Sequence, residues 1–404
     1  MELWKRNLII CWFGMFATGI GFSQIAPIMP LFIQHLGVHN AAQVEVWSGL
    51  AFGATFIISA VFSPIWGRAA DRYGRKPMLL RASLGMAIVI FLMGFSQNVL
   101  ELLILRLLQG VITGYSTACT TLIATQTDKE HAGTALGTLA TSGIAGSLLG
   151  PLVGGFIGET WGYQAVFFFT GFLMILTFLL TLLFVKESFT PENKKTAGHR
   201  ETWHLVPYKT LTLILFVSFF VSYLSLYSIE PILTVYISSL SLNIHHIAFM
   251  AGLIFSSTGL ATMLSSPLLG RLSDRRGPHK ILLFSLLFAA LCTIPQALVT
   301  NPWQLLALRF LLGLATGGIA PALNALVKRL TPPQLTGRLY GYTMSAGYLG
   351  VFCGSYLGGQ TASVWGIRVV FILVAGGILL NLLLVYWGLY RKINQLIDPV
   401  MKPT

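Results

Sequence analysis

The chain carries the stretch Gly-Arg-Ala-Ala-Asp-Arg-Tyr-Gly at residues 67–74 and repeats it as Gly-Arg-Leu-Ser-Asp-Arg-Arg-Gly at residues 270–277, 203 positions later. Each copy sets one acid, Asp71 or Asp274, among arginines and between two glycines. Clustered cations of this kind concentrate in the cytoplasmic loops of membrane proteins. The stretch therefore predicts two equivalent loops in a duplicated membrane protein.

The duplication extends far beyond these loops. The same offset takes Arg106 to Arg309, and after one inserted residue an offset of 204 continues the match. Matches this regular predict two homologous halves, 1–186 and 209–404, joined by a polar cytoplasmic linker at 187–208.

The composition excludes a soluble domain. Hydrophobic residues make up 55% of the 404 and charged residues only 10%, whereas a soluble protein carries about 25% charged residues. The chain therefore has too few charges to cover a water-facing surface. Its four cysteines lie in apolar stretches without paired spacing, so neither a disulfide nor a metal site is expected.

Apolar segments recur twelve times, each long enough to cross a bilayer, which takes roughly 20 residues. They lie at about 8–34, 46–66, 77–96, 100–125, 133–157, 164–185, 210–238, 247–269, 280–299, 303–327, 337–360 and 368–390.

The basic residues orient these spans. All but Arg106, Arg309 and Arg368 of the 26 Lys and Arg residues fall on the side of the two termini. The positive-inside rule makes this side cytoplasmic. The net charge of +13 therefore reflects topology and indicates no nucleic-acid partner. We expect a multi-pass protein of the bacterial inner (cytoplasmic) membrane that contacts the lipid bilayer and acts as a monomer, with both termini in the cytoplasm.

Six spans in each half make the two halves parallel repeats, the arrangement of major facilitator transporters. The expected fold class is an all-α membrane protein with the major facilitator fold, twelve transmembrane helices in two pseudo-symmetric six-helix halves. In further stretches the chain also resembles the multidrug-resistance group of the twelve-span drug:proton antiporter family. These stretches lie at 4–9, 47–49, 78–81, 122–126, 135–139 and 231–234.

This resemblance implies proton-coupled efflux of drugs or related amphiphilic small molecules by alternating access. The energy source would be the proton gradient, and no cofactor is expected. Many drug antiporters carry an acid in the first helix, but this chain has none between Asn7 and Gln34. The coupling position of those proteins therefore cannot be transferred to this sequence.

The repeated loops resemble the family's loop signature and are expected to gate transport. Their residues are Gly67, Asp71, Arg72, Gly74, Arg75, Lys76, Gly270, Asp274, Arg275 and Gly277. In this fold Asp71 is expected near the start of the eleventh helix, where Thr331 and Pro332 predict a cap. That contact would hold the two halves together on the cytoplasmic side. The alternative is a loop that only anchors the protein.

Arg106 lies within the fourth span, where a charge usually faces a cavity or a partner. With Gln109 it resembles the family's helix 4 motif, which is linked to proton coupling. Arg309 is its equivalent in the second half, but Leu312 replaces the glutamine there. The alternative for both arginines is a structural role, in which they cap carbonyl groups of a neighbouring helix.

The fifth span carries small residues at helical spacing, which allow close backbone approach. Gly146, Gly150, Pro151, Gly154 and Gly155 resemble the glycine-proline motif of major facilitator antiporters. The second half lacks the full motif. Close packing without any meaning for transport direction is the alternative.

The seventh span is expected to present Tyr223, Tyr227, Glu230 and Thr234 on one face. Glu230 is the only carboxylate well inside a predicted span. Burial there would favour its protonated form, so it is a candidate for proton coupling or for binding a cationic substrate. The alternative is a solvated acid near the outer mouth.

The expected cavity is lined by polar residues of the first, fourth, seventh and tenth spans. These candidates are Gln24, Tyr115, Thr117, Tyr223, Tyr227 and Asn324. Each is weak evidence alone, because polar side chains also bond between helices.

Two other functions stay open. One is export of a particular natural product, such as a siderophore or a sugar-like metabolite, and the other is a membrane sensor derived from a transporter. An enzyme is not expected, because no nucleophile, base and orienting group converge by spacing.

Overall fold

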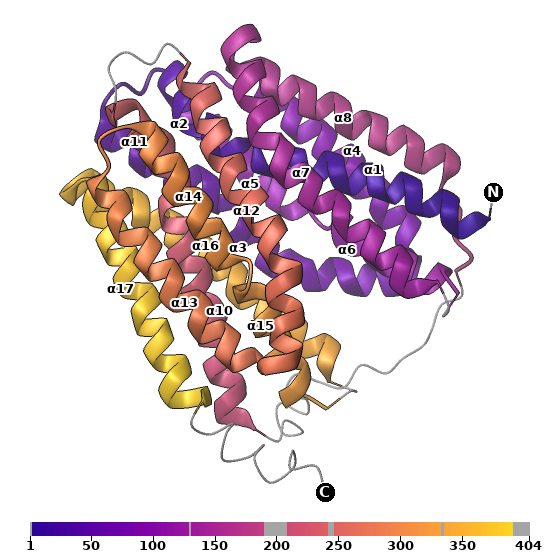
Figure 1. Ribbon diagram of the computed structural model, residues 1–404. Coiled ribbons are helices and arrows are strands. Elements are labelled where there is room, and N and C mark those ends of the chain that lie inside the picture. Colours follow the sequence, from indigo (N-terminus) through magenta and orange to yellow (C-terminus); the bar gives the residue numbers. More distant parts are fainter. Residues whose placement is uncertain (1, 129–130, 190–207, 241–245, 333–334, 391–404) are drawn as a thin grey trace, which may run out of the picture. The chain divides into compact units, whose positions relative to one another are not determined.

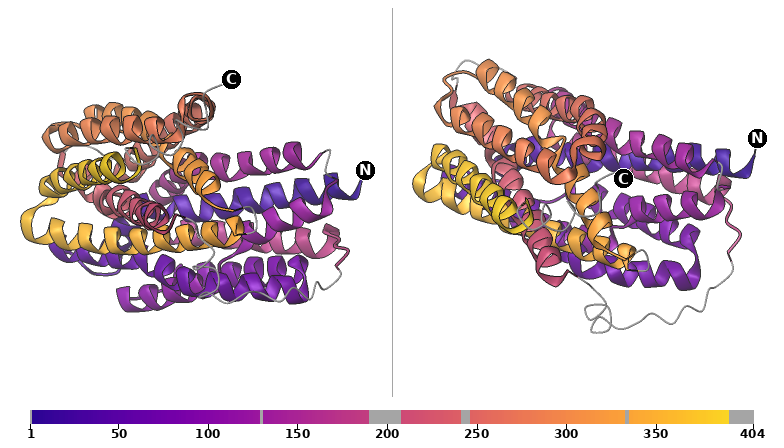
Figure 2. Two further views of the ribbon diagram at one scale, coloured as in Figure 1. Left: turned by 90° about the horizontal axis from the view of Figure 1, so that it is seen from below. Right: turned by 60° about the horizontal axis from the view of Figure 1, so that its bottom comes forward.

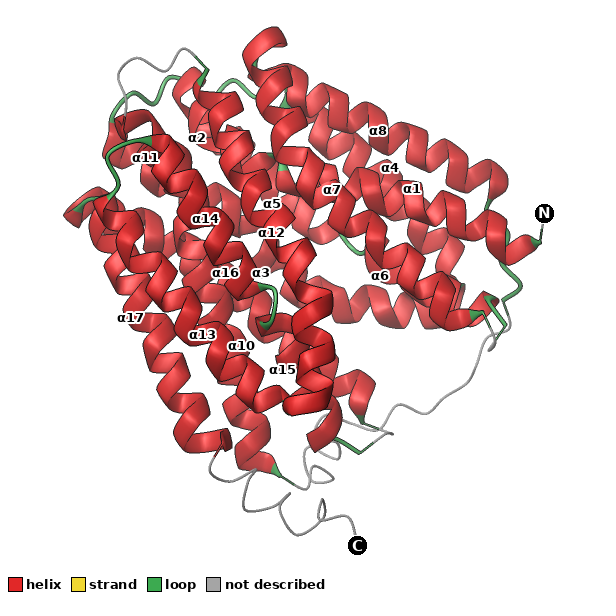
Figure 3. Cartoon of the chain, viewed as in Figure 1, coloured by secondary structure: helices red, strands yellow, loops and turns green. Residues whose placement is uncertain are grey.

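The computed structural model describes residues 2–128, 131–189, 208–240, 246–332 and 335–390, and its regular structure there is entirely helical (Figure 3). Ten helical segments are long and apolar enough to cross a membrane, and the pair α1–α2, bent by 47°, makes an eleventh. The remaining predicted span, 337–360, falls on α16, a helix of 30 residues. The expectation of an all-α membrane fold is confirmed.

The chain divides into two compact units (Figure 1). The first contains residues 1–194 and 230–256. Its helices are α1 (Leu3–Ser23), α2 (Ile25–His35), α3 (Ala41–Tyr73), α4 (Arg75–Met93), α5 (Val99–Ile112), α6 (Tyr115–Gln126), α7 (Ala132–Trp161), α8 (Tyr163–Phe184), η1 (Glu230–Ile232), α11 (Leu233–Leu240) and the start of α12 (Ile247–Arg276).

The second unit contains residues 195–229 and 257–404. Its helices are α10 (Lys209–Ile229), the remainder of α12, α13 (Pro278–Thr293), η2 (Ile294–Leu298), α14 (Pro302–Thr316), α15 (Ile319–Leu330), α16 (Thr336–Trp365), α17 (Ile367–Val385) and the π-helical turn η3 (Tyr386–Tyr390). Most of the predicted linker, residues 190–207, lies outside the described residues. The division expected at 187–208 stays a prediction.

In the first unit α1 lies along α7 (Figure 2), and glycines allow the two helices to pack closely. A Cβ atom added at Gly146 would stand 2.5 Å from the Phe16 carbonyl oxygen, and one at Gly154 would stand 2.6 Å from Gln24 Cβ. Ser23 adds a hydrogen bond of 3.1 Å to the Gly146 carbonyl oxygen. The glycine spacing of four residues therefore brings the two backbones into contact.

The second unit repeats this packing between α10 and α16. Gly350, Gly354 and Gly358 lie against the carbonyl groups of α10, and each is 204 residues beyond Gly146, Gly150 or Gly154. The duplication seen in the sequence is therefore also a duplication of helix contacts.

Replacing Gly150 with alanine is expected to destabilise the protein. The new Cβ atom would stand 2.9 Å from the Ile20 carbonyl oxygen and would collide with the Ser23 hydroxyl. Overpacking of this kind typically costs about 1–3 kcal/mol, so the unfolding temperature of the purified protein should fall. Gly137→Ala on the same helix is the control, because no atom lies within 4 Å of its added Cβ. An equal effect of both substitutions would contradict the packing argument.

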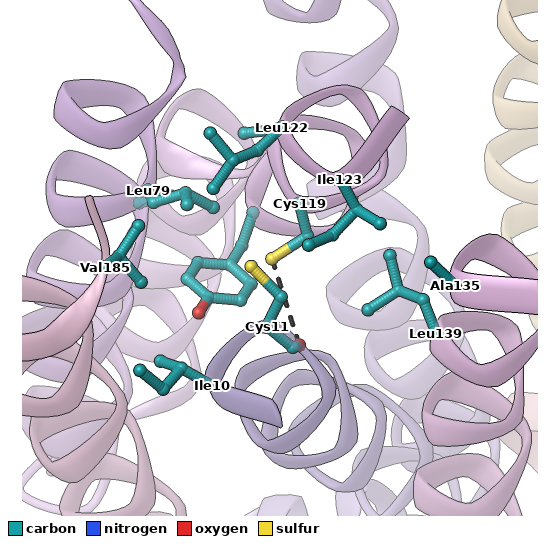
Figure 4. Close-up of a cluster of buried hydrophobic side chains, with 12 residues drawn as sticks. Ile10, Cys11, Leu79, Cys119, Leu122, Ile123, Ala135, Leu139 and Val185 are labelled. Atoms are coloured by element: carbon teal, nitrogen blue, oxygen red, sulfur yellow. Dashed lines mark hydrogen bonds between the residues drawn. The ribbon is translucent and has the colours of Figure 1, made fainter. Parts of the chain in front are cut away.

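A closed hydrophobic cluster fills the first unit between α1, α4, α6 and α7 (Figure 4). Tyr115 belongs to this cluster and is 1% exposed, and any side chain at Gly14 would collide with its ring. Cys119 donates a weak hydrogen bond to the Cys11 carbonyl oxygen at 3.9 Å. Both cysteines are free thiols buried in this cluster.

Candidate functional site

In the part of the chain that the structure describes, four breaks within spans lie at corresponding places in the two halves. The breaks fall between α1 and α2, between α5 and α6, between α10 and α11, and between α14 and α15. Irregular backbone at membrane depth is tolerated where it is buried in protein or lines a cavity, and transporters bind substrates and ions at discontinuous helices. The breaks therefore mark where a transport site is best sought, and three of them adjoin or contain predicted site residues.

Gln24 occupies the first break. It is 1% exposed, and its amide nitrogen donates hydrogen bonds to the Thr170 hydroxyl and, at 3.4 Å, to the Val166 carbonyl oxygen, both on α8. Its amide oxygen is buried without a hydrogen-bond partner among the described residues. Gln24 thus links the bend of the first span to α8, and its amide oxygen can still accept a hydrogen bond.

The second break depends on residues that sequence reasoning missed. Gly114 has φ +121°, a conformation that glycine adopts without strain. Arg81 donates to the Thr113 carbonyl oxygen at 2.8 Å and lies 3.6 Å from the centre of the Trp66 ring. This cation–π contact closes the break from the side of α3.

The second half has no copy of this arrangement. The offset of 203 takes Arg81 to Phe284 and Trp66 to Leu269. Gly317, the equivalent of Gly114, has φ −58°, an ordinary helical value. The fourth and tenth spans are therefore broken in different ways.

Arg106 bridges α5 and α3 just before the second break. Its Nε donates to the Ala51 carbonyl oxygen at 2.9 Å, and a terminal nitrogen donates to the Phe52 carbonyl oxygen at 3.0 Å. The other terminal nitrogen donates to Gln109 Oε1 at 2.6 Å. In return the Thr55 hydroxyl donates to the Arg106 carbonyl oxygen at 2.9 Å. Arg106 is 1% exposed, and these contacts match the alternative in which arginine caps a neighbouring helix.

Gln109 and Arg309 complete this comparison. Gln109 is fully buried, and its amide nitrogen has no hydrogen-bond partner among the described residues. Arg309 is also buried, on α14, but Leu312 stands where an amide would accept its hydrogen bond. The arginine–glutamine pair is therefore specific to the first half.

Glu230 lies in the third break and is half-buried. Pro231 follows it, and proline cannot continue the hydrogen bonding of an α-helix, so a 3₁₀ turn separates α10 from α11. Thr234 is fully buried in the first unit and donates to the Pro27 carbonyl oxygen at 3.0 Å. The expected single helical face from Tyr223 to Thr234 is wrong, because this turn interrupts the helix.

The two tyrosines of α10 are half-buried and stack on each other. The rings of Tyr223 and Tyr227 are parallel, with centroids 5.9 Å apart. Tyr223 also packs against Gly347 and Gly350 of α16. This location favours a packing role for Tyr223.

The remaining cavity candidates differ in burial. Tyr115 belongs to the closed cluster of Figure 4, where its hydroxyl lies 3.3 Å from that of Thr181. Thr117 is exposed on α6. Asn324 is half-buried on α15, and its carbonyl oxygen accepts a hydrogen bond of 2.9 Å from Tyr340. Tyr115 and Thr117 belong to the first unit and Asn324 to the second, and their role in lining a cavity stays a prediction.

The stretch at 67–74 is mostly helical, not a loop. α3 continues through Tyr73, and only Gly74, with φ +94°, makes the turn into α4. Asp71 is exposed and pairs with Arg75 at 3.3 Å. The Glu187 carboxylate accepts hydrogen bonds of 2.8 and 2.7 Å from the backbone amides of Arg75 and Lys76. This acid, which sequence reasoning missed, caps the positive end of α4.

The second copy has the same form. α12 includes Gly270, Asp274 and Arg275, and Gly277, with φ +96°, makes the turn into α13. The expected cap of the eleventh helix is wrong. α16 begins at Thr336, and Thr331 instead ends α15.

Glu45 is a buried acid that sequence reasoning also missed. The second span was expected to begin at about residue 46, but α3 begins at Ala41, where Asn40 Oδ1 accepts a hydrogen bond of 3.2 Å from the Gln43 amide. Glu45 therefore lies inside the helix and is 6% exposed. The expectation that Glu230 is the only carboxylate well inside a span stays a prediction, because Glu45 lies in the first turns of α3. Asn40, a favoured helix cap, was the signal for the earlier start.

Comparisons with known proteins agree with this architecture. The family model for the Major Facilitator Superfamily matches residues 11–244 and 215–399. The chain is 42% identical over 400 residues to multidrug resistance protein MdtG of Serratia proteamaculans, covering 99% of this chain and 97% of that protein. It is 44% identical over 390 residues to the protein of the same name from Salmonella arizonae, covering 96% of each.

Solved structures give the fold alone, because their identities are low. The human organic anion transporter MFSD10 (TETRAN) has a TM-score of 0.70 and 16% identity, over 95% of this chain and 100% of that one. A bacterial homolog of the human lysosomal transporter Spinster has a TM-score of 0.77 and 14% identity, over 96% and 97%.

Proposed function

The chain belongs to the Major Facilitator Superfamily, and from this premise we propose that it exports drugs or related amphiphilic small molecules from the cytoplasm in exchange for protons. It is a transporter and not an enzyme. The observation that carries the proposal is the identity of 42–44% over nearly the whole chain to proteins named for multidrug resistance.

Alternating access supplies the mechanism, with the monomer as the working unit. The broken spans allow local rearrangement around the site, and the glycine contacts of α1 with α7 and of α10 with α16 keep each unit packed. Arg106 fixes α5 to α3 beside the break at Gly114. Glu230, half-buried in its own break, takes up a proton facing outward and releases it facing inward.

The glycines and Pro151 of α7 support antiport. Pro151 removes a hydrogen bond within the helix, while Gly155 lets the start of α12 approach closely, with the Ala248 carbonyl oxygen 2.5 Å from an added Cβ. The Ser256 hydroxyl also donates to the Leu148 carbonyl oxygen at 2.7 Å. Close crossing at a bent helix suits a contact that forms and breaks during exchange.

The proposed location is the bacterial inner membrane, with both termini inside. In a Cys353→Ser background, which removes the half-buried native thiol, a cysteine at exposed His39 should react with an impermeant maleimide in intact cells. A cysteine at exposed Lys209 should react only after permeabilisation. The opposite pattern would overturn the orientation.

We also propose that Asp71 contributes to the gate. Asp71→Asn is expected to slow transport with little change in expression, because the amide removes the charge but keeps the shape. The measurement is uptake into everted vesicles, normalised to protein. Asp274→Asn, in the equivalent exposed position of the second copy, is the comparison. Normal rates for Asp71→Asn at normal expression would contradict a gating role.

A substrate panel tests the proposed function. Everted vesicles containing the protein should accumulate dyes and antibiotics when a proton gradient is present, and the accumulation should stop when the gradient is collapsed. Accumulation of one siderophore or sugar-like metabolite alone would favour export of a specific natural product. No accumulation of any compound would favour a sensor.

A further inference from the structure

We infer that Glu45 is a proton-binding site of the first unit, a carboxyl through which protons enter from the outer side. The inference rests on the proposed proton exchange but names a residue that belongs to none of the sequence motifs. Its ligand is the proton alone. The step is transfer of one proton onto a carboxylate oxygen and its later release, with no other bond made or broken.

Glu45 is buried without a partner among the described residues. Glu45 is 6% exposed on α3, and it makes no hydrogen bond or ion pair to any residue in the described ranges. An unpaired carboxylate inside a protein is costly, and acids within membrane spans mark ion pathways. A bound proton removes that cost.

Glu45 shares one face of α3 with several polar side chains. Ser48, Phe52, Thr55 and Ser59 follow it at helical spacing, and the Thr55 and Ser59 hydroxyls bond to the carbonyl groups of Arg106 and Gly110 on α5. This face is therefore turned to the protein and not to lipid. The Ser48 hydroxyl, one turn from Glu45, is fully buried without a hydrogen-bond partner among the described residues. A protonated carboxyl and a free hydroxyl at this spacing can pair.

The charged side chains on the elements packed against α3 bond to groups other than Glu45. α3 packs against α2, α4, α5 and η1. His35 of α2 bonds to Gln164, and the carboxylate of Glu101, on α5, accepts from the Gln97 amide and from the Asn98 side chain. Arg106 contacts Ala51, six residues from Glu45 or about 9 Å along the helix, where it is held by its own three acceptors.

The charges on α4 and η1 complete this survey. On α4, the charged groups of Arg75, Lys76 and Arg81 bond to the Asp71 carboxylate and to the Leu182 and Thr113 carbonyl oxygens, so they belong to the far end of α3. The turn η1 brings Glu230, the proposed coupling carboxyl, to the same unit and against the same helix. The helix that carries Glu45 and the turn that carries Glu230 therefore pack against each other. This arrangement suits a site where protons enter and a second carboxyl that accepts them.

The site suits a proton better than a larger cation. Among the described residues no group of three or more His, Cys, Asp or Glu side chains could hold a metal ion. An amphiphilic cation would need open space beside the carboxyl, but Glu45, Ser48 and Phe52 are all buried. A proton needs neither additional ligands nor a cavity.

Dicyclohexylcarbodiimide tests this directly, since it reacts with protonated carboxyls in apolar surroundings. In membranes containing the full-length protein, peptide mass spectrometry should find the adduct on Glu45, and its amount should decrease as the pH is raised. The exposed Glu101 carboxyl is the internal control and should stay unmodified. Absence of the adduct on Glu45, or labelling that does not change with pH, would overturn the inference.

Transport provides the second readout. Glu45→Gln should remove the dependence of export on external pH, Glu45→Asp should restore it, and Glu101→Gln should leave it unchanged. Wild-type pH dependence in Glu45→Gln would also overturn the inference. If the wild-type protein exports nothing against a gradient, the proposed function fails, and the labelling result still decides whether Glu45 binds a proton.

Discussion

Arg106→Ala should abolish transport, the largest loss expected from any single substitution in the first half. The guanidinium satisfies the Ala51 and Phe52 carbonyl oxygens and Gln109 Oε1 at once. Its removal leaves these buried acceptors without that partner, at a cost of about 1–3 kcal/mol for each one left unsatisfied. It also loosens α5 from α3 beside the break at Gly114. The measurement is the export rate per mole of protein, with the unfolding temperature recorded in parallel.

Two comparisons sharpen this prediction. Arg106→Lys should fail as well, because a lysine nitrogen cannot reach three divergent acceptors as a planar guanidinium does. Arg309→Ala should mainly reduce expression, because Leu312 deprives that arginine of the amide partner present in the first half. Equal loss of activity at equal expression would instead show that both halves share the role.

Glu230→Gln should block gradient-driven export while leaving substrate binding intact. Glutamine has the shape of the protonated acid, so the binding geometry persists, but the side chain can no longer exchange a proton. The 3₁₀ turn caused by Pro231 places this carboxyl at a break, where it is half-buried. A local rearrangement can therefore change the access of water to it. Binding of an amphiphilic dye to purified protein and its uptake into everted vesicles measure the two effects separately.

Glu2→Gln is a suitable control for this substitution. The hydrogen bond and ion pair with Lys5, at 2.9 Å, lower the pKa of the exposed Glu2 carboxyl and keep it ionised. Its loss should therefore leave coupling unchanged. If Glu230→Gln retains export with full dependence on the gradient, Glu230 is not the coupling residue.

The sequence predicted the features that repeat. Hydropathy predicted the spans, and the recurrence of Arg106 as Arg309 predicted equivalent buried positions. The glycines of the fifth span, on α7, predicted a tight helix interface, and both units contain one. These predictions succeeded because burial, charge and size act through the residue type itself. They need no knowledge of which helices are neighbours.

The helix breaks and their supports were not predictable in this way. The break at Gly114 depends on Arg81, from another helix, reaching the Thr113 carbonyl oxygen, and the sequence contains no local sign of that contact. Glu187 likewise caps a helix that begins more than 110 positions earlier, at Arg75. Glu45 was missed for a different reason, because a cap at Asn40 extended the helix beyond the hydrophobic segment.

The central claim is exchange of a substrate for protons, and one measurement tests it most directly. Purified protein is reconstituted into vesicles that enclose a pH-sensitive dye, and an outward-directed gradient of a transported antibiotic is imposed with no initial pH difference. The account predicts that protons move into the vesicles as the antibiotic leaves, and that Glu230→Gln abolishes this movement. Efflux of the antibiotic at the same rate with no change of internal pH would contradict it.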